Sequence, residues 1–388
     1  MKIALCHEKV LPELGGCETY IADLARRLSA DRHEVHLFAC AYDTSALPVE
    51  TIHHPVPMPR GPRFLRPWRF ASACVRALAL HPVDVSLGFI KTWGQDVLFP
   101  QGGLHLASVQ HNLQKCASWP GRVLAQLGKW LSPTHWSYKW LERHQYLDHE
   151  NTLIVVPSRF VQEHFLIHYH LGPDRVRVVA NAINPDRFQA LDRPLLRIEY
   201  REQFGLQPGD IAGLFVGHNY RLKGLEPLLR AIALLPPLPF KLLVVGNPDT
   251  RRYQRLASRL GIMNQVRFLG FQEEVRGCYF AADLLIHPTF YDPCALVTLE
   301  ALACGLPVIT TRANGASEIL PPAMQTFVLD DPHDAPRLAH NIELLCHPDI
   351  RANQARAARQ AATAWTFDDH YQALLDVLRE AAARKKAA

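Results

Sequence analysis

Two carboxylates stand close together in the stretch TFYDPCALVTLEALACGLPVIT, residues 289–310, where an apolar run predicts a strand followed by a helix. They are Asp292 and Glu300, eight positions apart. A carboxylate at this place can accept hydrogen bonds from both hydroxyls of a ribose, while amides of the helix start hold phosphate. Glu300 is therefore a candidate for nucleotide binding.

Each carboxylate also has a structural interpretation. Glu300, near the predicted helix start, can complement the helix dipole at the surface. Asp292 precedes Pro293, and Asp-Pro is typical of an N-cap followed by the first helical position. Gly305 and Pro307 predict where this helix ends.

Two cations follow the first predicted strand of the second half, in GHNYRLKG, residues 217–224. Arg221 and Lys223 lead into a predicted helix, and cations beside helix-start amides suit a diphosphate. The alternative is a solvated basic turn.

Two glycines, Gly15 and Gly16, follow the predicted strand KIALC and precede a helix. They allow close backbone approach to an anion, although a tight turn explains them equally well. The fingerprint G-x-G-x-x-G is absent there, which removes the main support for a nicotinamide enzyme.

A polar segment, residues 93–112, follows a strand of the first half and is expected to bring Asp96, Gly102, Gly103 and His105 toward the same cleft. One histidine among twenty is a weak signal. No spacing of metal ligands stands out, so we expect no metal site.

These candidates need a scaffold of alternating strands and helices. Short apolar runs alternate with amphipathic segments along the whole chain, and the pattern restarts after NAINPDRFQ. This predicts α/β architecture with two doubly wound, Rossmann-like domains, residues 1–180 and 181–365, facing a central cleft. A linker is expected at 181–195, helices near 223–235 and 250–260, and a C-terminal helix, 366–384, that packs back on the first domain.

Composition limits the function further. The chain has 388 residues, 48% of them hydrophobic, and a net charge of +5, which suits anionic ligands or membranes and is too weak to indicate nucleic acid. Its nine cysteines form no C-x-x-C pair, which indicates reduced thiols in a cytoplasmic protein. No apolar run is long enough to span a bilayer, so we expect a soluble or peripheral protein.

Two stretches mix aromatic and basic residues, PRGPRFLRPWRFASACVR at 59–76 and KWLSPTHWSYKWLERH at 129–144. This mixture is typical of interfacial membrane contact, and equally of core helices whose rims carry long cations.

With these residues in view, the whole chain resembles the retaining family 4 glycosyltransferases of the GT-B fold. The resemblance is carried by GGCE, VGHNYRLKG, the D-x7-E spacing with ALACGLPVIT, and GASEIL, in family order. Within the family it is similar to lipopolysaccharide core glucosyltransferases in KTWGQDVLF and in a basic, membrane-contacting segment.

The resemblance implies a set of roles. Glu300 would hold the donor ribose, Asp292 the transferred sugar, and Arg221 with Lys223 the diphosphate. His105 would lie near the reacting sugar, and Asp96 on the acceptor side. Further donor-binding positions would be Gly15, Gly16, Gly217, Phe268, Gly270, Leu296 and Val297.

The implied reaction is retaining transfer of a hexose, glucose by nearest resemblance, from a UDP-sugar to a lipopolysaccharide core or other envelope glycan. No metal is expected, and the enzyme would be located on the cytoplasmic face of the inner membrane. Two departures from the family pattern are Asp292 in place of Glu and the tight spacing of Arg221 and Lys223. The alternatives are a nucleotide-sugar epimerase of the same fold and an inactive nucleotide-sugar-binding scaffold.

Overall fold

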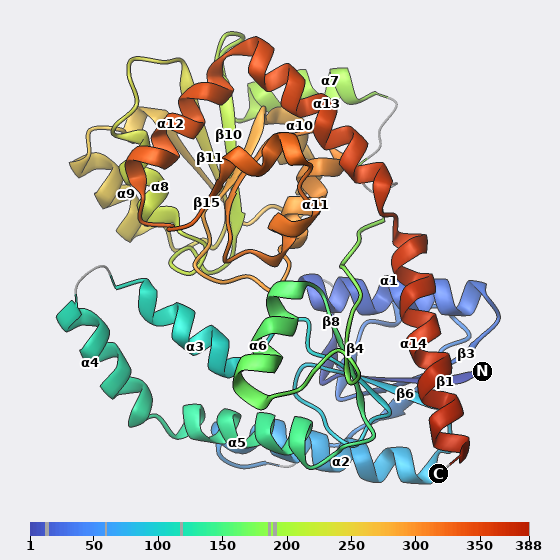
Figure 1. Cartoon of the computed structure of the whole chain (residues 1–388). Helices are drawn as coiled ribbons and strands as arrows, with labels where there is room; N and C mark the ends of the chain where they lie inside the picture. The colour runs from blue at the N-terminus through green and yellow to red at the C-terminus, as the bar shows by residue number, and fades with distance from the viewer. Residues whose placement is uncertain (12–14, 59, 117–118, 185–187, 189–191, 388) are drawn as a thin grey trace. The chain divides into compact units, whose positions relative to one another are not determined.

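The chain forms two compact units (Figure 1). The computed structural model describes residues 1–11, 15–58, 60–116, 119–184, 188 and 192–387. Unit 1 comprises Met1–Asn181 and Asp368–Ala388, and unit 2 comprises Ala182–Phe367. Part of the expected linker at 181–195 lies outside the described residues.

Unit 1 is built on a parallel sheet in the order β5-β3-β1-β6-β7-β8-β9. Its strands are β1 (Lys2–Cys6), β3 (Glu34–Ala39), β5 (Ile52–Pro55), β6 (Val85–Phe89), β7 (Val97–Phe99), β8 (Leu153–Val156) and β9 (Val176–Val178). A small separate pair joins β2 (Lys9–Val10) to β4 (Ala41–Tyr42).

Helices connect these parallel strands. They are α1 (Gly16–Ala30), α2 (Arg66–Leu80), α3 (His105–Gln114), α4 (Trp119–Trp130), α5 (Pro133–Leu147) and α6 (Arg159–Tyr169).

The last helix, α14 (Phe367–Ala387), returns to unit 1 (Figure 1). Its His370 Nε2 lies 2.6 Å from the Tyr20 hydroxyl of α1, and its Nδ1 lies 2.7 Å from the Ala180 carbonyl oxygen. Burial lowers the pKa of His370 to about 4, so this ring is neutral at pH 7. Side chains at helical spacing, Tyr371, Leu374 and Leu378, are buried, which makes α14 part of the core of unit 1.

Unit 2 has a parallel sheet in the order β12-β11-β10-β13-β14-β15. Its strands are β10 (Ile211–Gly217), β11 (Phe240–Gly246), β12 (Val266–Gly270), β13 (Leu284–His287), β14 (Val308–Thr311) and β15 (Val328–Leu329). Its helices are α7 (Arg193–Gln203), α8 (Leu225–Ile232), α9 (Arg251–Arg259), α10 (Arg276–Ala281), α11 (Leu296–Ala303), α12 (Ala335–Cys346) and α13 (Pro348–Ala364).

Both faces of this sheet are buried, as the unbroken apolar runs of the strands require. Successive residues of β10 point to opposite faces: Phe215 packs in a core with α8, α9 and α12, and Leu214 in a core with α10, α11 and α13. The carboxyl ends of all its strands lie at one edge, where the polar turns gather.

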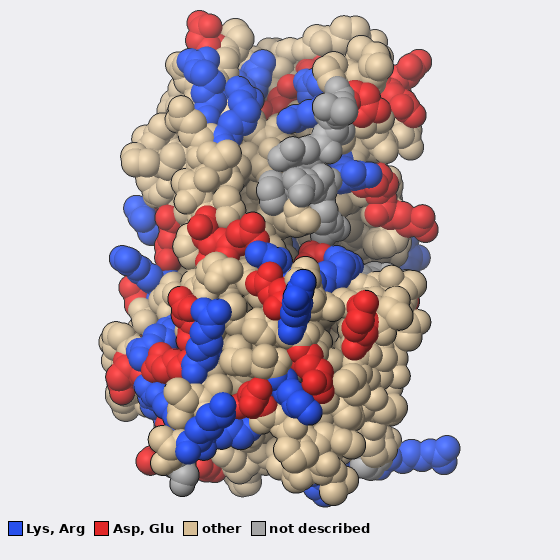
Figure 2. All heavy atoms as spheres, turned by 90° about the vertical axis from the view of Figure 1, so that its right-hand side faces the viewer, with Lys and Arg blue, Asp and Glu red and all other residues tan. Residues whose placement is uncertain are grey.

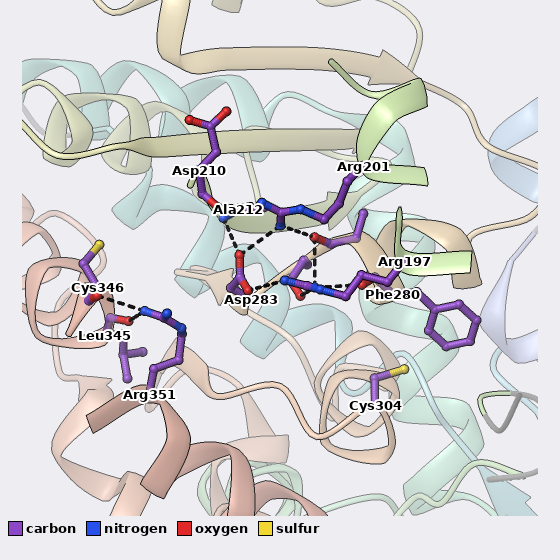
Figure 3. A network of polar contacts seen from close by, with 12 residues as sticks. Arg197, Arg201, Asp210, Ala212, Phe280, Asp283, Cys304, Leu345, Cys346 and Arg351 are labelled. Atoms are coloured by element: carbon purple, nitrogen blue, oxygen red, sulfur yellow. Dashed lines mark hydrogen bonds and ion pairs between the residues drawn. The ribbon is translucent and has the colours of Figure 1, made fainter. Parts of the chain in front are cut away.

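Within unit 2, a network of hydrogen bonds and ion pairs joins α7 to the end of α10 and to Asp283 (Figure 3). Arg197 and Arg201 both pair with Asp283, whose carboxylate also accepts from the Ala212 amide at 2.8 Å. Arg197 donates in addition to three carbonyls at the end of α10, those of residues 280–282. Because unmatched carbonyls at a helix end need donors, the guanidinium completes α10 while holding α7.

The predicted fold class is confirmed: each half is a parallel α/β sheet with helices between the strands. The helices predicted near 223–235 and 250–260 are α8 and α9. Five short strands were not predicted: β2, β4, β5, β7 and β15. All nine cysteines are free thiols.

The surface carries mixed charge on the face shown in Figure 2, where Lys and Arg side chains lie next to Asp and Glu over much of the area. On α14, for example, Arg384 pairs with Glu380 and Arg379 with Asp376. Within the described ranges, no helix combines the length and the apolar character needed to cross a bilayer.

Candidate active site

The turn between β10 and α8 carries the first candidate cation. Gly224, the N-cap of α8, has a left-handed φ of +82°. A Cβ atom there would lie 2.0 Å from the Pro288 carbonyl oxygen, so only glycine fits this contact. The turn that carries Lys223 is therefore packed directly against the loop after β13. Arg221 lies exposed in the same turn.

Lys223 and Asp292 form an ion pair across these two loops. Nζ of Lys223 lies 2.5 Å from Oδ2 of Asp292, and the side chains are only 20% and 13% exposed. His287, at the end of β13, places Nε2 3.5 Å from the same oxygen. Burial alone raises the pKa of Asp292, but Lys223 and His287 overcome it and lower the pKa to about 2. Asp292 is therefore negatively charged at neutral pH.

The backbone around Asp292 is held by the loop after β14. The Asp292 amide donates to the Ala313 carbonyl at 2.9 Å, and the Gly315 amide donates to the Asp292 carbonyl at 2.8 Å. Between them, the side chain of Asn314 accepts from the amides of Ala295 and Ala316.

The other end of the Asn314 amide is also occupied, because Nδ2 donates to the hydroxyls of Thr298 and Thr310. Asn314 is fully buried. With two donors and two acceptor lone pairs in use, it joins the start of α11 to β14.

The N-cap interpretation of Asp292 is wrong. Helix α11 begins at Leu296 with Ala295 as its N-cap, three residues beyond Asp292. The side chain of Asp292 is instead directed to Lys223, because a buried carboxylate gains more from a cation than from a helix start.

Glu300 lies in the fifth position of α11, in the middle of this short helix rather than near its start. Its Oε2 accepts a hydrogen bond of 2.5 Å from the hydroxyl of Tyr279 in α10. Tyr279 is fully buried and was not among the predicted residues. The helix ends as predicted, with Gly305 at a left-handed φ of +66°.

The other predicted donor-binding positions of unit 2 lie on the same strand edge and on α11. All are partly exposed. Gly217 and Gly270 end β10 and β12, Phe268 lies within β12, and Leu296 and Val297 form the first turn of α11.

In unit 1, helix α1 begins at Gly16 with Gly15 as its N-cap. Gly15 has an extended φ of 164°, which any residue can adopt, so its conformation does not demand glycine. Glu18, in the first turn, lies 3.7 Å from Nε2 of His7 at the end of β1. The helix start thus faces the carboxyl edge of this sheet.

His105 is the first residue of α3. Its Nε2 lies 3.0 Å from Nδ1 of His135. Burial, with His135, Lys129 and Lys91 nearby, lowers the pKa of His105 to about 4, so the ring is neutral at pH 7.

The start of α3 is capped by Glu142 of α5. Its two carboxylate oxygens accept from the amides of His105 and Leu106, and the Tyr169 hydroxyl donates to it at 3.1 Å. Burial raises the pKa of Glu142 to about 7 despite these hydrogen bonds.

The position of Asp96 does not support an acceptor-side role. It precedes β7 and lies at the amino ends of the strands, the edge opposite to Gly102, Gly103 and His105. Its Oδ2 accepts from the amide and hydroxyl of Ser86 and pairs with Lys385 of α14 at 3.0 Å. The sequence could not show this, because a residue between two strands can face either edge.

Two arginines of the first aromatic-basic stretch have partners within unit 1: Arg66 pairs with Glu8, and Arg69 donates to the Pro62 carbonyl. Among the residues that the structure describes, no group of three or more His, Cys, Asp or Glu side chains is arranged to hold a metal ion.

Two family models match the chain. The model for glycosyltransferase family 4 matches residues 14–187, and the model for group 1 glycosyl transferases matches residues 197–364. The chain is 26% identical to the lipopolysaccharide glucosyltransferase WaaG of Escherichia coli over 366 residues, covering 93% of this chain and 94% of that protein. It is 27% identical to a D-inositol 3-phosphate glycosyltransferase of Acidothermus cellulolyticus, covering 97% and 88%.

Solved glycosyltransferase structures share the fold of this chain. The crystal structure of WaaG superposes with a TM-score of 0.81 at 26% identity, over 97% of this chain and 99% of that one. Anabaena HepE in complex with UDP shares the fold, with a TM-score of 0.70 at 19% identity, over 98% and 100%. From the two family matches and the shared architecture, the chain belongs to the glycosyltransferases of the GT-B fold, with family 4 sequence in its first half and group 1 sequence in its second.

Proposed function

We propose that this glycosyltransferase is a retaining hexosyltransferase that moves glucose from UDP-glucose to a lipopolysaccharide core or other cell-envelope glycan. The observation that carries the proposal is the buried Lys223–Asp292 ion pair at the carboxyl edge of unit 2. The resemblance to the glucosyltransferase WaaG over 93% of the chain supports the choice of substrates.

The donor would bind on unit 2. Glu300 would accept the ribose hydroxyls, with its rotamer held by Tyr279. Lys223 and Arg221 would meet the diphosphate together with the first-turn amides of α11, at Leu296 and Val297. The ends of β10 and β12, at Gly217 and Gly270, would face the nucleoside.

The sugar would be held by the charged Asp292, which stays ionised because Lys223 lies beside it. Gly15 and Gly16 of unit 1 would approach the diphosphate through their backbone, and the neutral His105 would hydrogen-bond the reacting sugar. These assignments rest on the family resemblance together with the charge and burial of each group.

In the transfer, the bond from the anomeric carbon to the phosphate oxygen breaks, and a bond to the acceptor oxygen forms on the same face. The acceptor hydroxyl proton passes to the departing diphosphate. Lys223 and Arg221 would stabilise the negative charge that develops on that diphosphate, so the chain contributes positioning and electrostatics.

We also propose peripheral contact with the anionic cytoplasmic face of the inner membrane. The contact would be made by α4 and the first half of α5, since none of the twelve residues of α4 is buried. Exposed apolar side chains there include Trp119, Leu124, Trp130, Leu131 and Trp140. Lys129 and Lys139 lie among them, a combination suited to an anionic interface.

Sedimentation with lipid vesicles tests this membrane contact. Replacing Trp130 and Leu131 by Ser should release the protein from vesicles that contain anionic lipid, and added salt should weaken the wild-type interaction. Equal sedimentation of the variant and the wild type would contradict the contact.

The decisive experiment for the reaction is transfer from UDP-glucose to core oligosaccharide isolated from a deletion strain, followed by mass spectrometry. A gain of one hexose, with the α-configuration of the donor kept, is expected, and EDTA should leave it intact. Glu300→Gln should weaken UDP binding about 10- to 100-fold by calorimetry, since a charged hydrogen bond is worth about 1.5–3 kcal/mol.

The two alternatives give different outcomes in the same assay. An epimerase would convert the sugar nucleotide without an acceptor, and an inactive scaffold would bind UDP-glucose and leave both substrates unchanged.

A further inference from the structure

Two cavities of unit 1 meet at the carboxyl end of β6. One, of about 160 Å³, is lined by Gly102, Gly103 and His105 among others. The second, of about 220 Å³, is lined by His7 and Glu18 among others. Ile90 and Lys91 line both, so the two cavities form one groove along the strand edge.

The junction is strained. Ile90 has a left-handed φ of +56°, a conformation that a β-branched residue rarely adopts. It is held there by buried Gln145, whose Nε2 donates to the carbonyls of Ile90 and Thr92. Strain of this kind persists where the surroundings enforce it, and it is concentrated at binding sites. Here it sets the direction of the residue that follows, Lys91.

The groove contains two lysines, Lys9 and Lys91, and neither forms an ion pair among the residues that the structure describes, although the charge of Lys91 lowers the pKa of nearby Glu142. Within the described ranges, the ammonium groups of Lys91 and Lys9 have no ion-pair or hydrogen-bond partner, and the backbone of Lys9 pairs with β4. The Lys91 ammonium lies 4.0 Å from the centroid of the Tyr138 ring, and the side chain is half-buried. A cation–π contact orients the ammonium without neutralising it.

The carboxylates of the groove are already engaged. Glu8 pairs with Arg66, Glu18 faces His7, and Glu142 accepts from two amides and the Tyr169 hydroxyl. The two ammonium groups are therefore left to meet an anion from outside the chain.

We propose that this groove binds the acceptor and that Lys9 and Lys91 select an acceptor carrying an anionic group, either a phosphate monoester or a carboxylate. The inference rests on the proposed function and adds the chemical class of the acceptor. Placing two cations around one anion gives specificity, because an acceptor without that group leaves both lysines unpaired and loses affinity.

The test compares three forms of one core oligosaccharide: untreated, treated with phosphatase, and with its carboxyl groups reduced to alcohols. The treatment that removes the recognised anion should raise the acceptor KM of the wild type about 10- to 100-fold. Lys91→Gln and Lys9→Gln should show that raised KM with the untreated acceptor and respond to neither treatment. UDP affinity should be unchanged, and Lys91→Arg should keep most of the acceptor affinity.

The matched control is Lys2→Gln, which removes one charge at the opposite end of β1, where Lys2 pairs with Glu34. It should behave as the wild type does. If the wild type transfers glucose and Lys91→Gln keeps its KM within twofold for all three acceptors, the anion selection is refuted while the proposed function stands. If the wild type binds no UDP and transfers nothing, the proposed function itself fails, and this inference with it.

Discussion

A buried carboxylate of unit 2 and one of unit 1 have pKa values that are shifted in opposite directions. Asp292 in unit 2 and Glu142 in unit 1 are both largely hidden from solvent. Asp292 has Lys223 at 2.5 Å, and its pKa is lowered to about 2. Among the described residues, Glu142 accepts hydrogen bonds from two amides and a phenol and feels a smaller effect of the Lys91 charge, and burial still raises its pKa to about 7.

The difference shows that burial sets the cost of a charge and the partner decides whether the charge remains. Hydrogen bonds from neutral donors reduce the cost for Glu142 without cancelling it, whereas an ammonium reverses it for Asp292. A permanently charged carboxylate suits a polar ligand site. Glu142 caps the start of α3 even though burial brings its pKa to about 7, since the capping amides favour its ionised form only in part.

Removing the cation should make Asp292 resemble Glu142. Lys223→Met leaves a buried carboxylate without its partner, so we expect a loss of about 3–5 kcal/mol in the free energy of unfolding at pH 8. The loss should shrink toward acid pH, where Asp292 takes up a proton. Chemical denaturation across pH 4–8 would measure it.

The double variant Lys223→Met with Asp292→Asn is the control, because it removes both charges and should recover most of the lost stability. A single variant as stable as the wild type at pH 8 would show that the ion pair is not what keeps Asp292 ionised.

For Glu142, the predicted effect is a loss of stability as pH rises. Its native pKa lies above the ordinary value of 4.5, so the protonated form favours folding, and the contribution is complete below pH 4.5 and lost as pH rises through 7. Relative to Glu142→Gln, the wild type should lose about 2–3 kcal/mol of stability between pH 5 and pH 8. A pH-independent difference between the two proteins would contradict the raised pKa.

Asp292→Asn tests whether the charge that Lys223 maintains is used in the reaction. Transfer should fall about 10- to 100-fold, as for the loss of a charged hydrogen bond, while UDP affinity stays the same because UDP lacks the sugar. Asp249→Asn, an exposed partner of Arg251 in the same unit, is the control and should keep full activity. Full activity of the Asp292→Asn variant would exclude the sugar contact.

The smallest expected effect is that of Tyr279→Phe. It removes the hydrogen bond to Glu300 and keeps the ring, so UDP affinity should fall a few fold, corresponding to about 0.5–1.5 kcal/mol. Calorimetric titration of UDP into the Tyr279→Phe and Glu300→Gln variants measures the two losses of affinity side by side. An effect as large as that of Glu300→Gln would mean that Tyr279 itself contacts the ligand.

The sequence predicted the parts of this molecule that follow from local pattern. The long apolar strands, the end of α11 at Gly305 and the placement of Lys223 and Asp292 in loops that follow strands could be read from local pattern, whereas Glu300 lies in the middle of α11 and not near its start as expected. The short strands β5 and β15 could not, because four and two residues carry too little periodicity.

Contacts between segments that lie far apart in the sequence could not be predicted either. The pairing of Asp292 with Lys223, 69 positions away, depends on which loops the parallel sheet places side by side. The same reason applies to Tyr279 beside Glu300, to Glu142 at the start of α3, and to Asp96, whose true partner Lys385 lies 289 positions along the chain.

The return of α14 to unit 1 has a consequence for synthesis on the ribosome. Unit 2 is a continuous segment, so it can fold as soon as residue 367 has emerged. Unit 1 must wait for α14, because Tyr371, Leu374 and Leu378 complete its core and His370 closes the contact with Tyr20. The half that is translated first is therefore expected to be finished last. Until then its uncovered apolar side chains are open to chaperones and proteases.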